Sequence, residues 1–231
     1  MVLNRTRHPI AKVVAALALG AAMLLPAAAS SAPPPPHTPL ITDPVGDTGY
    51  FCPSNVTIFG LQARCGREIP TSSAPSADIV QGDITLQSTS LVFDTTVVDL
   101  DDPSAHPDSA TSFSMTAVTG NVSIKVNASR TFRQEPPYAT LEVSNRSTFR
   151  TVTTPATAVF DNTTNTVSWT VPLTRLNESV THVCPECREL QRGSTLTEIS
   201  AATTYEDRSM VLSVGASDSA YANRPYTIGD D

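Results

Sequence analysis

The sequence has few basic residues and almost no lysine. Fifteen Lys and Arg residues stand against 22 Asp and Glu residues, which gives a formal net charge of -7 at pH 7. Lys12 and Lys125 are its lysines. A protein that binds nucleic acid needs a basic face for the phosphates, so this charge balance argues against nucleic acid as a partner. Apolar residues make up 40% of the chain, which excludes wholesale disorder.

The chain also lacks the short motifs that mark common catalytic sites. It contains no Gly-x-Ser-x-Gly elbow, no His-Glu-x-x-His pair, no phosphate loop and no dinucleotide fingerprint. Beyond residue 29 its histidines are His37, His106 and His182. We therefore predict a protein that is not an enzyme and has no catalytic residues. A hydrolase of unrecognised class is the lesser alternative, because two well-placed carboxylates suffice for glycoside hydrolysis.

No apolar run reaches the roughly 20 residues that span a bilayer. The apolar run at residues 13–25 follows Arg5, Arg7 and Lys12, and a proline and three alanines come after it. A cationic start, a short apolar core and small residues at its end are typical of a secretory signal peptide. We predict that residues 1–29 are removed after Ala29. The expected product is a secreted, extracellular protein with no membrane insertion after cleavage.

The rest of the chain predicts one β domain behind a linker. Residues 30–39 are rich in proline, which favours a stiff, extended linker. Within residues 40–231, apolar and polar residues alternate at 122–126, 139–143, 167–171 and 210–214, and fuller apolar runs occupy 79–86 and 91–100. Alternation of period two is typical of strands with one buried face. We predict an all-β, antiparallel sandwich of jelly-roll type with about eight to ten strands.

Two local features are expected within this domain. Residues 161–165, with the sequence Asp-Asn-Thr-Thr-Asn, predict a hairpin loop that joins strands at 156–160 and 166–172. One short helix is expected after Cys184. Pro185 would occupy its first position and Gly193 the position just past its end, where these residue types are favoured.

Four cysteines follow the predicted signal peptide. An oxidising compartment favours two disulfides, and four cysteines allow three pairings. Our choice is the local one, Cys52 with Cys65 and Cys184 with Cys187. One alternative is a redox pair at Cys184 and Cys187, since a thiol at a helix start has a lowered pKa. The other is a zinc site held by all four thiolates.

Carboxylates gather in the expected turns. Asp43 and Asp47 lie in the segment Asp-Pro-Val-Gly-Asp, where glycine lets the backbone curl, and Asp78 precedes the first long apolar run. Loops at one end of a sandwich can bring carboxylates together around calcium, which takes six to eight oxygens. We predict that Asp43, Asp47 and Asp78 bind calcium and that no other cofactor is needed. The alternative is ordinary turn chemistry, in which aspartates cap the backbone without a metal.

Several short segments share their order with a group of known modules. They are Thr-Asp-Pro-Val-Gly-Asp-Thr-Gly at 42–49, Ala-Asp-Ile-Val at 77–80, Leu-Val-Phe-Asp-Thr-Thr-Val-Val-Asp-Leu at 91–100, and Ser-Asp-Ser-Ala at 217–220. This order resembles β-sandwich accessory modules of secreted, actinobacterial-type proteins. Some of these modules stand beside subtilisin-like proteases, and others are similar to family 9 carbohydrate-binding modules. The resemblance implies a jelly-roll-like sandwich, an accessory role and, from the glucan-related modules, a calcium ion near Asp43 and Asp47.

The leading functional hypothesis is a secreted, non-catalytic module that binds a carbohydrate or a cell-surface polymer. Its partner would then be an extracellular polysaccharide. The alternative is a structural or protein-interaction module that pairs with another secreted protein. Trp169 lies on an alternating strand, so we expect it in the core rather than under a sugar ring. The tyrosines lie near loops or strand ends and are freer to contact a ligand: Tyr50, Tyr138, Tyr205, Tyr221 and Tyr226.

Overall fold

The structure is a computed structural model that describes residues 38–51, 57–58, 61–62, 74–101, 109–131, 134–207 and 214–230. All of these belong to one compact unit, His37–Asp231. The predicted signal peptide, most of the predicted linker, and Cys52 and Cys65 lie outside the described residues.

Five strands form the first sheet, in the order β1-β5-β6-β12-β11 with every neighbouring pair antiparallel. Its strands are β1 (Ile41–Thr42), β5 (Ile79–Gln87), β6 (Ser90–Val97), β11 (Ala158–Asp161) and β12 (Thr166–Pro172). The predicted hairpin is confirmed, because β11 pairs with β12 around the turn at 162–165. Asp161 fixes this turn by accepting hydrogen bonds from the Thr163 amide at 2.8 Å and the Thr164 hydroxyl at 3.0 Å.

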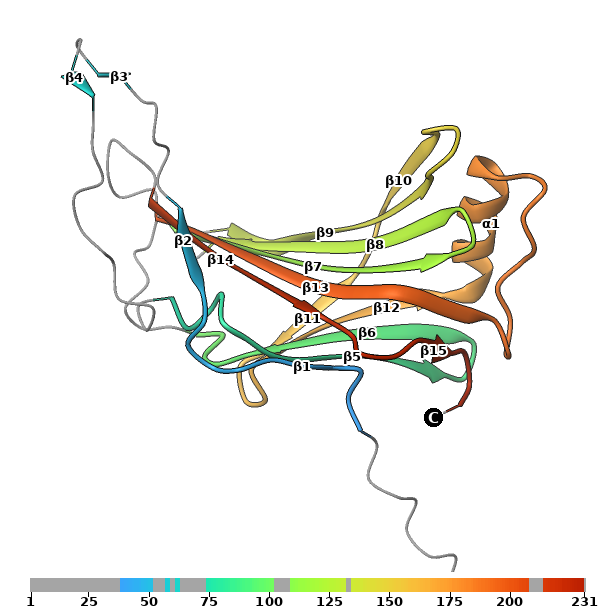
Figure 1. Cartoon of the computed structure of the whole chain (residues 1–231), viewed down its shortest axis with the longest axis horizontal. Helices are drawn as coiled ribbons and strands as arrows, with labels where there is room; N and C mark the ends of the chain where they lie inside the picture. The colour runs from blue at the N-terminus through green and yellow to red at the C-terminus, as the bar shows by residue number, and fades with distance from the viewer. Residues whose placement is uncertain are drawn as a thin grey trace, which may run out of the picture. The chain divides into compact units, whose positions relative to one another are not determined.

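Eight strands form the second sheet, along the path β10-β9-β8-β7-β13-β14-β2, with β15 paired to β13. The bounds are β2 (Gly49–Phe51), β7 (Ala110–Thr119), β8 (Val122–Thr131), β9 (Gln134–Asn145), β10 (Thr151–Pro155), β13 (Thr195–Asp207), β14 (Val214–Tyr221) and β15 (Tyr226–Thr227). Strands β7 to β10 follow one another as a meander (Figure 1). A small separate pair joins β3 (Thr57–Ile58) to β4 (Leu61–Gln62).

The two sheets face each other, with the hydrophobic core between them (Figure 1). The predicted alternation is confirmed, since the apolar positions of β8, β9 and β12 are buried. Phe113 from one sheet meets Phe160 from the other edge to face, with ring centres 5.8 Å apart. The fourth alternating segment, 210–214, falls mostly outside the described residues. The fold class is therefore an all-β, antiparallel sandwich, as the sequence predicts.

The single helix of the described residues lies elsewhere than expected. Helix α1 spans Leu173–Val183, ahead of the cysteine pair, whereas residues 185–192 form turns and loop. The prediction that Pro185 begins the helix was wrong. The reason is that Leu176, Val180 and Val183 repeat every three to four residues, so helix formation buries all three against the sheets. Helix α1 packs on β9, β10 and β12 at one end of the sandwich (Figure 1).

Candidate functional site

Three carboxylates from distant parts of the chain meet where the two sheets come together at one edge. Asp43 follows β1, Asp47 precedes β2, and Asp218 lies on β14. Each offers one carboxylate oxygen, and these oxygens all lie within 4.8 Å of one another. The β1–β2 connection crosses from the five-stranded to the eight-stranded sheet, and β14 contacts both β1 and β5. The cluster therefore joins the edges of the two sheets.

The predicted third ligand, Asp78, lies beside this cluster and holds its loop. The Gly46 amide donates a 2.8 Å hydrogen bond to Oδ2 of Asp78. Gly46 has φ of +92°, a conformation that glycine adopts without steric cost. This bond curls the segment from Asp43 to Asp47 toward Asp78. Asp78 is 4% exposed, and its second oxygen, Oδ1, is buried without a hydrogen-bond partner.

Asp218 is the cluster residue that the sequence prediction missed. Its carboxylate accepts hydrogen bonds from the amides of Ile79 and Ser219, at 2.8 and 2.7 Å, and it is 7% exposed. On β14 the inward positions are Ala216, Asp218 and Ala220, all buried. A charged residue at an inward position of a strand signals a special environment, because isolated buried charges are costly. That signal was present in the sequence.

Burial and the neighbouring carboxylates change the titration of Asp43, Asp78 and Asp218. Burial raises the pKa of Asp43 to about 6, and the negative charges of Asp218, Asp47 and Asp78 add to this rise. Burial likewise raises the pKa of Asp78 and of Asp218, although backbone amides that donate to each carboxylate oppose the shift. The ion pairs Arg130–Asp101 and Arg146–Glu198 involve none of these acids. The cluster thus concentrates negative charge in a partly buried place.

The residues present fit a calcium ion. Calcium prefers several oxygen ligands, and carboxylates neutralise its charge. Oδ2 of Asp43 and Oδ1 of Asp78 are both buried and make no hydrogen bond. A buried polar atom without a partner is costly, and a cation would give both of these oxygens a partner. Asp43, Asp47, Asp78 and Asp218 are the side chains that could hold the ion.

Other carboxylates show the ordinary turn chemistry that was the alternative. Asp99 accepts a hydrogen bond from the Asp101 amide at 3.1 Å, and Asp101 pairs with Arg130 at 3.2 Å. Asp161 caps its hairpin turn, and the hydrogen bonds from Thr163 and Thr164 lower its pKa. These acids have partners within the protein, in contrast to the orphaned oxygens of Asp43 and Asp78.

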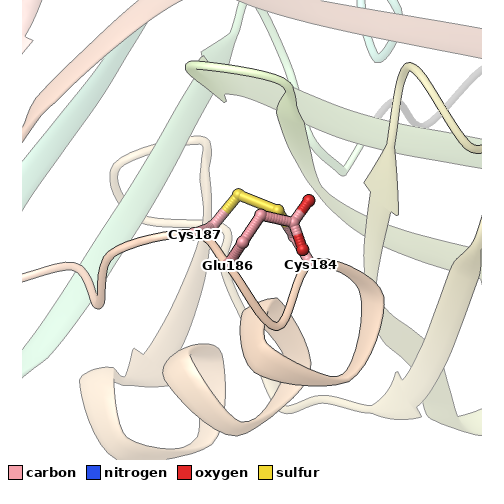
Figure 2. A group of neighbouring side chains, drawn as sticks. All are labelled: Cys184, Glu186 and Cys187. Carbon is pink, nitrogen blue, oxygen red and sulfur yellow. A yellow bond between two sulfur atoms is a disulfide. The ribbon is translucent and has the colours of Figure 1, made fainter.

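Cys184 and Cys187 form a disulfide directly after α1, as Figure 2 shows with Glu186 beside it. Their Cα atoms are 5.3 Å apart, and the Cys187 amide donates to the Cys184 carbonyl. Cys184 caps the helix C-terminus, not an N-terminus as predicted. The partial negative charge at a helix C-terminus disfavours a thiolate, so the position of Cys184 gives no support to the alternative of a redox pair. The pairing of Cys52 with Cys65 concerns residues outside those described.

The aromatic residues divide between core and surface. Trp169 is fully buried, which confirms that it is a core residue. Tyr226 is buried and Tyr205 is partly buried, so neither is free to receive a ligand. Tyr138 and Tyr221 are well exposed. Phe149, which the sequence analysis did not single out, is the most exposed large apolar side chain of the described residues.

Comparisons of the chain with protein-family models, curated proteins and solved structures gave no significant match. Within the described part of the chain, no helix combines the length and the hydropathy that crossing a bilayer requires.

Proposed function

We propose that this chain is a secreted, non-catalytic β-sandwich module that binds calcium at its acidic cluster and a polymer on its surface. The observation that carries the calcium proposal is the pair of buried oxygens without partners, Oδ2 of Asp43 and Oδ1 of Asp78. Both belong to carboxyl groups whose pKa burial raises. Calcium there would tie β1, β5 and β14 together and stabilise the edge of the sandwich.

A carbohydrate or a cell-surface polymer is the proposed ligand of the module. This proposal is supported by the outer face of the eight-stranded sheet. That face carries mostly hydroxyl side chains, whereas a solvent-facing sheet surface more often carries charged ones. On β7, β8 and β9 these are Ser112, Ser114, Thr116, Ser123, Ser129, Thr140 and Ser144. Hydroxyl groups that donate and accept suit a polyhydroxylated ligand.

The alternative, a module that pairs with another secreted protein, has one observation in its favour. Strand β11 is an edge of the five-stranded sheet, and Val159 on it is well exposed. An unpaired strand edge can accept a strand from a partner. Because β11 is four residues long, it offers few backbone hydrogen-bonding groups to a partner strand.

Calorimetric titration of the decalcified protein with calcium chloride at pH 7.5 tests the calcium proposal. We expect saturable binding at one site. Asp47→Asn should weaken it about tenfold or more, since this exposed acid supplies one of the converging oxygens. Asp230→Asn, at an exposed acid elsewhere, is the matched control and should bind as the parent does. Absence of saturable binding at millimolar calcium would overturn the proposal.

A further inference from the structure

A cleft of about 730 Å³ lies on the outer face of the eight-stranded sheet, away from the acidic cluster. Its walls come from β7, β8, β9, β10, β13 and β14 and from the turn between β9 and β10. This volume is within the range of about 300–1,000 Å³ that is common for ligand sites. Two exposed aromatic side chains line it, Phe149 at 87% and Tyr221 at 74% exposure.

Hydrogen bonds in the turn before β10 fix the backbone of Phe149 in this exposed position. Phe149 has φ of +57°, which is unfavourable for a bulky side chain. The side chain of Asn145 accepts hydrogen bonds from the amides of Ser147 and Thr148, at 2.9 and 3.1 Å, and its carbonyl accepts one from Phe149 at 2.8 Å. Asn145 is itself fixed by a 3.3 Å bond to the Val183 carbonyl of α1. A strained backbone conformation that several hydrogen bonds maintain is typical of functional positions.

A β-bulge on the opposite wall directs a second strained residue into the cleft. The register of β13 against β7 shifts between Thr197 and Ser200, and Glu198 within this bulge has φ of +48°. Bulges often re-aim a side chain beside a binding site. Glu198 pairs with Arg146 at 2.8 Å, and both side chains remain about half exposed. The pair offers donors and acceptors while its net charge is zero.

Besides the apolar Val118, the cleft is lined by five hydroxyl side chains. They are Thr116, Ser123, Ser144, Thr151 and Ser200. Strands β7, β8, β9 and β13 each pair with a neighbour on both sides, whereas β10, which carries Thr151, is an edge strand of the sheet. Over these four strands a ligand therefore meets side chains, and β10 offers a strand edge of five residues to a peptide that adds as a strand.

A second hollow of about 400 Å³ continues the cleft along the strands. Ser114, Lys125 and Ala202 of the second hollow each stand two residues beyond a cleft residue of the same strand, and hence on the same face. Lys125 lies opposite Glu142 on β9, so the charges in this part balance as well. Exposed Tyr138 lines this hollow. The two hollows lie next to each other on one face with aromatic side chains in both, and we refer to them together as the trough.

We propose that this trough binds a neutral oligosaccharide chain. Sugar rings present an apolar C–H face that packs on Phe149 and Tyr221, and their hydroxyl groups match the hydroxyl side chains that line the cleft. Arg146 and Glu198 donate to and accept from the same sugar units. Balanced charges in the trough favour a neutral glycan over an anionic one. This inference rests on the proposed function as a binding module, and it adds the surface and the ligand class.

Affinity gel electrophoresis tests the proposal in gels that contain barley β-glucan, galactomannan, laminarin or starch. We expect at least one of these neutral polysaccharides to retard the protein. Phe149→Asn should lower the affinity about tenfold or more, because the aromatic platform is lost. Asparagine tolerates positive φ, so this variant should fold at least as well as the parent. Tyr221→Ala should also lower the affinity, whereas Val159→Ala, at an exposed apolar residue of the other sheet, should not.

Each contrary result has a distinct meaning. Retardation that Phe149→Asn and Tyr221→Ala leave unchanged would place the glycan elsewhere and overturn the trough, while the proposed binding function would stand. A further gel contains anionic alginate, and retardation in that gel alone would overturn the neutral ligand class. No retardation in any gel by a protein that binds calcium would overturn both the trough and the polysaccharide ligand, and leave the calcium site.

Discussion

The carboxylate of Asp218 accepts a 2.8 Å hydrogen bond from the backbone amide of Ile79, which is 139 residues away in the sequence. This bond links β14 of the eight-stranded sheet to the first residue of β5 in the five-stranded sheet. It also fixes the carboxylate beside Asp43 and Asp47. The acidic cluster is thus part of the contact between the sheets, and its charge state should affect the stability of the whole domain.

Asp78→Asn should separate two effects of the acidic cluster, its effect on stability without calcium and its binding of calcium. An asparagine oxygen can still accept from the Gly46 amide, and its NH2 group would replace the buried oxygen that has no partner. One negative charge also leaves the cluster. In EDTA we therefore expect a melting temperature equal to or above that of the parent, and little further rise with calcium. A melting temperature several degrees lower in EDTA, with a normal response to calcium, would contradict this account.

The effect of calcium should depend on pH. In the calcium-free protein the pKa of Asp43 is about 6, above its ordinary value of 3.8. The folded state therefore binds more protons between these two values, and the free energy of unfolding falls as pH rises from about 4 to about 6. Calcium should offset this loss above pH 6 and have little effect below pH 4.5, where protons occupy the site. Melting curves with and without calcium across this pH range measure the rise in melting temperature that calcium causes. A rise that does not depend on pH would refute the assignment of the calcium site to Asp43 and its neighbours.

Trp169 should tolerate phenylalanine far better than alanine. It is fully buried opposite Phe93 of β6, and its indole N–H has no acceptor among the described residues. Truncation to alanine should cost about 3–5 kcal/mol of unfolding free energy. Trp169→Phe loses some packing but removes a buried N–H without a partner, so we expect a cost of about 1 kcal/mol. Urea denaturation followed by circular dichroism gives both values, and equal costs would contradict the expectation that phenylalanine is tolerated better.

The disulfide should contribute modestly to stability. Cys184 and Cys187 are three residues apart, and closure of so short a loop is worth about 2 kcal/mol. The double variant Cys184→Ala/Cys187→Ala should lose about that amount in urea denaturation. It should also loosen the end of α1 and hence Asn145, which bonds to the Val183 carbonyl. Unchanged stability would mean that the bridge is dispensable to the fold. A thiol count on the unreduced protein should find neither Cys184 nor Cys187 free.

The strands were predictable because their cause is local. Val122, Ile124 and Val126 alternate with polar residues, and one buried face is the direct consequence. The helix could also have been found, since Leu176 and Val180 carry its period. It was misplaced because the proline and glycine signals at 185 and 193 have a second explanation, the turns around the disulfide.

The candidate sites were less predictable because they depend on distant residues meeting. Asp43 and Asp47 share one loop and were identified from it, but Asp218 reaches them only when β14 lies beside β1. The trough depends on the backbone at Phe149 and Glu198, where positive φ values arise from a turn and a bulge. Phenylalanine and glutamate rarely adopt a positive φ, so sequence patterns alone could not identify Phe149 and Glu198.

The most direct measurement for the central claim is a crystal structure of the protein grown in calcium chloride, with anomalous differences collected at a long wavelength. The account predicts one anomalous peak bounded by carboxylate oxygens of Asp43, Asp47, Asp78 and Asp218, at about 2.3–2.6 Å from its ligands. The peak should vanish in Asp78→Asn crystals. A well-ordered cluster with no peak, or with a protonated Asp43 bonded to Asp218 in its place, would contradict the claim.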